Sequence, residues 1–83
     1  MTYPQFRKYP HNKTFFKINS ASDFDELQIL GNTFSLTKLV AKILPDRNYI
    51  SDMLENTNEY WVLSNEEEFN ERLNFCKQNL KQV

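Results

Sequence analysis

The clearest pattern of apolar and polar positions surrounds Gly31-Asn32. Gly-Asn between two apolar runs is typical of a two-residue β-hairpin turn, because glycine accepts the positive φ that the turn requires. Pairing residue 30 with residue 33 sorts the flanking residues by polarity, as a half-buried antiparallel pair requires. The pairs are Ile29–Phe34 and Leu27–Leu36 on one face, Gln28–Ser35 and Glu26–Thr37 on the other, and the opposite charges Asp25–Lys38. The sequence therefore predicts a hairpin with strands at about 24–30 and 33–43.

A second pattern overlaps the later half of this hairpin. Apolar residues at positions 36, 39, 40, 43 and 44 have the spacing of the buried stripe of a helix, which Pro45 would end. The helix and the strand exclude each other over residues 35–44. We favour the strand, with a β-bulge near residues 37–39. The bulge would turn the following side chains toward the core: Leu39, Ala41 and Ile43.

Three further elements follow from shorter patterns. An aromatic and branched run predicts a strand at about 14–18, and a similar run predicts another at about 59–63. Between them, Pro45-Asp46 opens a segment whose apolar residues share one helical side. Proline suits the first turn of a helix and an acidic residue complements the positive end of its dipole. This segment predicts a short helix at about 46–55.

The strongest helix pattern spans residues 65–81. Ser64 and Glu67 have the spacing of a capping box, and acidic residues precede basic ones along the segment, as the helix dipole favours. One apolar seam runs along it in steps of four and three residues: Phe69, Leu73, Cys76, Leu80 and Val83. We expect this seam to pack on the sheet.

Together these elements predict an α+β fold, with a small antiparallel sheet of about four strands and both helices packed on one face. Residues 14–83 form this single domain. Residues 1–13 contain Pro4 and Pro10, which argue against a continuous helix or a central strand. We therefore expect them to form an extended arm that carries basic and aromatic residues.

Composition excludes several classes of protein. The 83 residues are 40% hydrophobic and 14% aromatic, which supports one small packed domain and not a disordered chain. A single glycine excludes dinucleotide-binding and P-loop motifs, and a single cysteine excludes a disulfide framework. His11 lies in the expected arm and Cys76 on the inward seam, so neither is placed for catalysis. We expect no catalytic residue, no metal site and no cofactor.

Charge is distributed unevenly along the chain. Residues 1–17 hold four basic and no acidic residues, whereas residues 18–83 hold six basic and eleven acidic ones. Cations interleaved with aromatic rings are the side chains that single-stranded nucleic acid binders use. The candidate binding residues are Arg7, Lys8, Tyr9, Lys13 and Lys17. The same composition also suits an arm that folds across the acidic body and places its aromatic rings at the edge of the core, or one that docks on an acidic partner.

These observations favour a small, non-enzymatic protein that binds another protein or a second copy of itself through an exposed sheet face or an open edge. Binding of nucleic acid by the arm is the alternative. No apolar run reaches the length of about 18 residues that a membrane span needs, and we expect no membrane association. The absence of a signal-like start and the single free thiol of Cys76 favour the cytoplasm.

Overall fold

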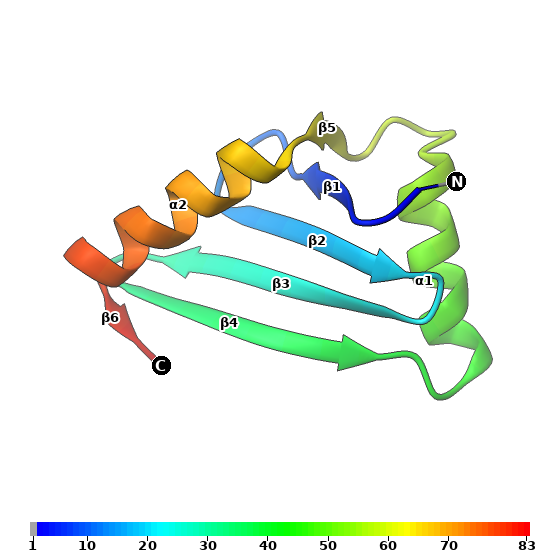
Figure 1. The fold of residues 1–83 in the computed structure, drawn as a ribbon, viewed down its shortest axis with the longest axis horizontal. Coiled ribbons are helices and arrows are strands. Elements are labelled where there is room, and N and C mark those ends of the chain that lie inside the picture. The colour runs from blue at the N-terminus through cyan, green and yellow to red at the C-terminus, as the bar shows by residue number, and fades with distance from the viewer. Residues whose placement is uncertain (1) are drawn as a thin grey trace.

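The computed structural model describes residues 2–83, which form an α+β fold with six strands and two helices (Figure 1). The sheet is mostly antiparallel and has the order β5-β1-β2-β3-β4-β6. Its strands are β1 (Gln5–Lys8), β2 (Thr14–Ser20), β3 (Asp23–Leu30), β4 (Thr33–Val40), β5 (Val62–Ser64) and β6 (Lys81–Gln82). The helices are α1 (Leu44–Glu55) and α2 (Glu66–Asn79). The predicted class is confirmed, and the sheet has two short strands beyond the expected four.

The hairpin of β3 and β4 has the predicted register. Leu30 pairs with Thr33, and every pair expected from the sequence is present back to Asp25 opposite Lys38. Gly31 has a φ of 58°, the left-handed conformation for which glycine is favoured at such a turn. Polarity and turn chemistry therefore select the same register.

Residues 33–40 form a strand and not a helix, but two details of the prediction are wrong. The β3–β4 ladder continues without a register shift to Val40, so there is no bulge near residues 37–39. The strand also ends before residue 43, and α1 begins at Leu44 with Pro45 in its first turn. Pro45 therefore starts a helix and does not end one, because a first-turn proline loses no intrahelical hydrogen bond.

Both faces of the sheet are buried, which corrects the expectation that both helices cover one face. Neighbouring residues of a strand point to opposite faces, so Phe15 and Phe16 enter two separate cores. The core between α2 and the sheet contains Phe6, Phe15, Leu27, Phe34, Phe69 and Cys76. The core between α1 and the sheet contains Phe16, Ile18, Phe24, Ala41, Ile50 and Met53. Figure 1 shows α1 and α2 at opposite ends of the long strands.

The expected arm at residues 1–13 is instead part of the sheet. Residues Gln5–Lys8 form β1, which pairs with β2 on one side and β5 on the other. Pro4 and Pro10 flank this four-residue strand, so no proline interrupts its ladder. Phe6 is buried under α2, as the alternative of an arm folded across the body requires. Met1 lies outside the described residues.

The last helix is shorter than predicted and is capped one residue later. Asn65 is the N-cap, and its side chain accepts a hydrogen bond from the Glu68 backbone N–H, while the Ser64 hydroxyl donates to the Glu68 carboxylate. After Asn79 the chain leaves the helix, and β6 pairs in parallel with the first two residues of β4. Extended pairing with β4 therefore replaces the last predicted helical turn.

Candidate functional site

The structure does not gather the five candidate binding residues onto one surface. Arg7 is buried, only 6% exposed, on the face that α1 covers. Its Nε donates to the Met53 carbonyl at 3.0 Å and its Nη2 to the Leu54 carbonyl at 3.3 Å. These carbonyls belong to the last turn of α1, which has no basic residue of its own. Arg7 thus stabilises the carboxyl end of this helix, where a positive charge is favoured, and is not free to meet a phosphate.

The other four candidates lie apart from one another. Lys8 forms a 2.8 Å ion pair with Glu68 of α2, on the opposite face from Arg7. Tyr9 donates to or accepts from the Tyr49 hydroxyl at 3.2 Å and stacks on Trp61. Only two of the five lack such a side-chain contact, and they lie in the β1–β2 turn and in the middle of β2: Lys13 and Lys17. Nucleic-acid binding by these residues stays a prediction, and no single surface in residues 2–83 combines them.

The Lys8–Glu68 pair makes stability depend on pH in a defined direction. Hydrogen bonds from Lys8 and Ser64 hold the pKa of the Glu68 carboxyl below its ordinary value. Because the folded-state pKa is lowered, the pair contributes stability above the ordinary glutamate pKa of about 4.3 and loses it as pH falls through the lowered value. Glu68→Gln is therefore expected to flatten this acid-side loss in urea unfolding, by about 1 kcal/mol at most because the carboxylate is partly exposed. An acid-side loss identical to that of the wild type would contradict this role.

The remaining reactive side chains have structural positions. Cys76 is fully buried on the sheet-facing side of α2, and burial raises the pKa of its thiol, which makes it a poor nucleophile. His11 accepts a hydrogen bond from the Lys13 backbone N–H in the β1–β2 turn. Within residues 2–83 no three His, Cys, Asp or Glu side chains are grouped to hold a metal ion. Neither helix in this range has the length and apolarity to cross a bilayer.

The outer side of β4 is an open strand edge. Ala41 donates its N–H to Ser22 on the β3 side at 2.7 Å, whereas the Phe34 carbonyl accepts from Val83 on the outer side at 2.9 Å. Backbone groups alternate direction along an antiparallel strand, so the even-numbered residues of β4 point their N–H and C=O groups outward. Strand β6 covers only Thr33 and Phe34. The outward groups of the next three even-numbered residues therefore have no strand partner within residues 2–83: Leu36, Lys38 and Val40.

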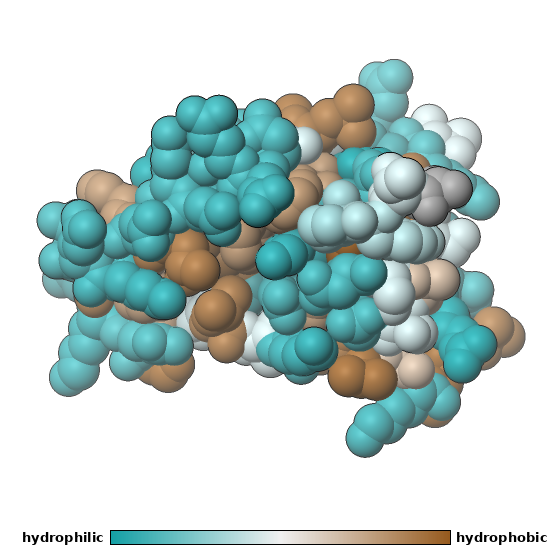
Figure 2. Space-filling model, in the orientation of Figure 1, coloured by the Kyte–Doolittle hydropathy of each residue, from teal (hydrophilic) through white to brown (hydrophobic). Residues whose placement is uncertain are grey.

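Exposed apolar side chains follow this edge onto the start of α1. We name them the β4 strip: Leu36, Leu39, Val40, Ile43 and Leu44, exposed by 37%, 42%, 52%, 60% and 69%. Figure 2 shows hydrophobic surface over the carboxyl-terminal end of β4. These are the residues whose spacing suggested a helix stripe, and none of them is buried in the core. Side chains alternate along β4, so Leu36 and Val40 lie on the face of α2 and Leu39 on the face of α1. Exposed apolar side chains on both sides of unpaired backbone groups are typical of a protein-binding site.

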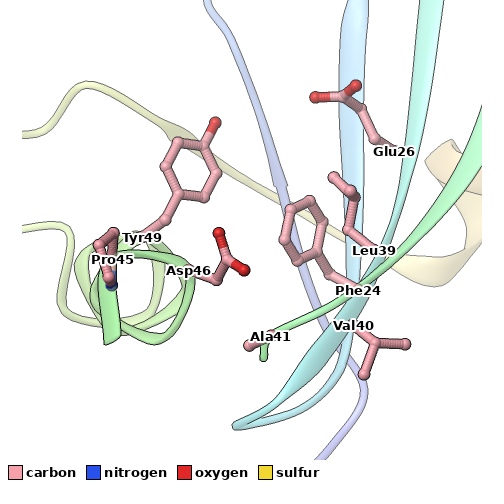
Figure 3. Close-up of a pocket in the computed structure, with 8 residues that line it drawn as sticks. All are labelled: Phe24, Glu26, Leu39, Val40, Ala41, Pro45, Asp46 and Tyr49. Carbon is pink, nitrogen blue, oxygen red and sulfur yellow. The ribbon is translucent and has the colours of Figure 1, made fainter. Parts of the chain in front are cut away.

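A pocket of about 260 Å³ opens beside the strip, between the sheet and the start of α1 (Figure 3). Its walls are mostly apolar: Phe24, Leu39, Val40, Ala41, Pro45 and the ring of Tyr49. Two carboxylates enter it from opposite walls, Glu26 from β3 and Asp46 from α1, and Figure 3 shows each pointing toward the other wall. Burial raises the pKa of the Glu26 carboxyl and, with the nearby Tyr9 hydroxyl, that of Tyr49. The pocket thus combines apolar walls with two carboxyl groups.

Comparison of the chain with models of known families, with curated proteins and with solved structures finds no match.

Proposed function

We propose that this chain is a non-enzymatic protein-interaction module that adds an extended segment of a partner protein as a new strand on β4. The observation that carries the proposal is the open β4 edge, where three residues offer unpaired backbone groups beside the exposed β4 strip. Strand addition uses both features, since backbone hydrogen bonds supply affinity and alternate side chains supply specificity. The buried free thiol of Cys76 is compatible with a role in the cytoplasm.

The protein does little to block this edge. Natural sheets protect edges with very short strands, prolines or charged side chains. The opposite edge, β5, has three residues, whereas β4 has eight and contains no proline. The one charged residue of β4 is Lys38, and its ammonium group lies 3.5 Å from Asp23 on a neighbouring strand. This contrast favours β4 as the edge that binds.

A partner other than a second copy of the chain fits the edge better. The symmetric antiparallel register that uses all three free residues pairs Leu36 with Val40 and Lys38 with itself. Two like charges directly opposite each other destabilise a strand pair. We therefore propose a different protein as the main partner, and sedimentation at micromolar concentration checks the homodimer.

Lys38→Pro tests the proposal. The outward backbone N–H of Lys38 has no strand partner in residues 2–83, so this substitution removes a donor that only an added strand would use. The probe is a displayed library of extended peptides of about eight residues, the length of an ordinary strand. We expect peptides that bind the wild type and Lys38→Ala, which keeps the N–H, and that bind Lys38→Pro at least about tenfold more weakly.

Two results would overturn strand addition at β4. One is a library without binders, and the other is a set of binders that Lys38→Pro leaves unchanged. Circular dichroism of the three proteins shows whether the variants remain folded. If Lys38→Pro unfolds the chain, a peptide N-methylated at alternate positions replaces it, because methylation on the pairing side removes the peptide N–H groups that would donate to the outward carbonyls of β4.

A further inference from the structure

We infer that the pocket between β3, β4 and α1 receives an arginine or lysine side chain of the strand bound at β4. The inference rests on the proposed function and adds the chemistry of the partner. Three observations carry it: the position of the pocket relative to the open edge, its two carboxylates and its apolar walls.

The position of the pocket favours a long side chain. Leu39 and Val40, at the open end of β4, line the pocket, and Glu26 lies on β3, the next strand inward. Neighbouring strands are about 4.8 Å apart, so an added strand would lie about 10 Å from β3. A side chain from the added strand must cross β4, past Thr37 or Leu39 on the pocket face, to reach the Glu26 carboxylate. Arginine and lysine do this readily, because their methylene stems lie along apolar surface while the charged end reaches a polar group.

The charge of the pocket favours a cation. The ion pairs in residues 2–83 are Lys8–Glu68 and Lys38–Asp23, so neither Glu26 nor Asp46 is paired with a cation there. Asp46 accepts only a 3.4 Å backbone hydrogen bond, from Lys42. Glu26 is half-buried, and burying a carboxylate without a partner is unfavourable. An incoming guanidinium or ammonium group would give these carboxylates a cationic partner, which the described part of the chain does not provide.

A second copy of the chain would not supply this cation. The side chains of β4 on the pocket face are those of the odd-numbered residues, which are uncharged: Thr33, Ser35, Thr37 and Leu39. The lysine of β4, Lys38, lies on the opposite face. The two carboxylates also disfavour an anionic occupant such as a phosphate group. The occupant is therefore a basic extended segment of another protein.

Two synthetic peptides test the inference. Both have about eight alternating threonine and valine residues, a length typical of strands, and they differ only at one central position, arginine in one and methionine in the other. We expect the arginine peptide to bind the wild type about tenfold more tightly in a fluorescence anisotropy titration. Glu26→Gln should reduce the difference to about threefold or less.

The matched control is Asp25→Asn. It removes the same charge from the adjacent residue of β3, whose side chain points to the other face of the sheet. The arginine preference should persist in this variant. Asp46→Asn, on the exposed first turn of α1, should also reduce the preference for the arginine peptide. This variant replaces Glu26→Gln in the test if Glu26→Gln does not fold.

The outcomes separate this inference from the proposed function. Equal binding of both peptides that is lost in Lys38→Pro overturns the cation pocket and leaves strand addition intact. An arginine preference that persists in both Glu26→Gln and Asp46→Asn also overturns the pocket. Binding of neither peptide, or binding that Lys38→Pro does not affect, overturns both proposals.

Discussion

Arg7→Met is expected to lower the free energy of unfolding by about 3 kcal/mol, because it leaves carbonyl groups of the last turn of α1 without a donor. In the wild type the guanidinium donates to the carbonyls of Met53, Leu54 and Phe6. Methionine keeps much of the buried stem but supplies no hydrogen bond. Burial removes water from the Arg7 guanidinium and thereby lowers its pKa. The three hydrogen bonds compensate for this lost hydration. The loss is measured by urea unfolding.

Lys13→Met is the matched control for Arg7. It removes the same charge from the same basic segment, but Lys13 is exposed in the β1–β2 turn, and its removal should change stability by less than about 0.5 kcal/mol. Arg7→Lys should give an intermediate loss, since lysine keeps the charge but not the fork of donors. Equal stability of Arg7→Met and Lys13→Met would show that Arg7 does not hold α1.

Phe16→Ala should cost about 3–5 kcal/mol, as truncation of a fully buried phenylalanine usually does. Phe16 is 0% exposed and contacts the rings of Tyr9, Phe24 and Tyr49. A chain of this size has a total stability of roughly 4–12 kcal/mol. The variant should therefore unfold at a much lower urea concentration than the wild type, or be unfolded without urea.

Phe75→Ala provides the comparison for Phe16. Phe75 is 46% exposed on α2, where it contacts the guanidinium of Arg72, and its truncation should cost less than about 1 kcal/mol. Phe16→Leu leaves a smaller cavity, so its loss of stability can be measured if the alanine variant does not fold. Similar losses for Phe16→Ala and Phe75→Ala would contradict the second core beneath α1.

The elements predicted from the sequence are those that local chemistry determines. Gly31 and the alternating residues around it specify the hairpin, because turn geometry and side-chain alternation act within a few residues. The stretch from Glu66 to Asn79 has both a capping sequence and a helical apolar seam, so α2 was also predictable. Errors at its ends arise because Asn65 competes with Ser64 as the cap and β6 pairs with β4.

What the sequence could not reveal depends on contacts between distant residues. Strand β1 was expected to be an arm, since its four residues become a strand only by pairing with β2 and with β5, more than fifty residues away. Arg7 reaches carbonyl oxygens 46 and 47 residues further along the chain, and no local pattern indicates such a partner. The adjacent phenylalanines Phe15 and Phe16 in one predicted strand are the available sequence signal that the sheet is covered on two faces, and both are buried.

The candidate site was visible in the sequence only in part. The apolar spacing of the β4 strip was recognised, but apolar residues in a pattern are ordinarily assigned to the core, and their exposure depends on where α1 and β6 dock. Glu26 and Asp46 are twenty residues apart in the chain and line one pocket only because α1 lies against β3 and β4. The open edge itself is a property of strand order, which the local patterns do not specify.

Residue-resolved amide hydrogen exchange of β4 tests the central proposal most directly. The free protein should show alternation, with fast exchange at Leu36, Lys38 and Val40 and slow exchange at the inward-facing residues between them, Thr37 and Leu39. Addition of the arginine peptide should slow the three fast amides and leave the others unchanged. A continuous protected run across residues 35–44, as a helix would give, or three outer amides that stay fast with saturating peptide, would contradict strand addition at this edge.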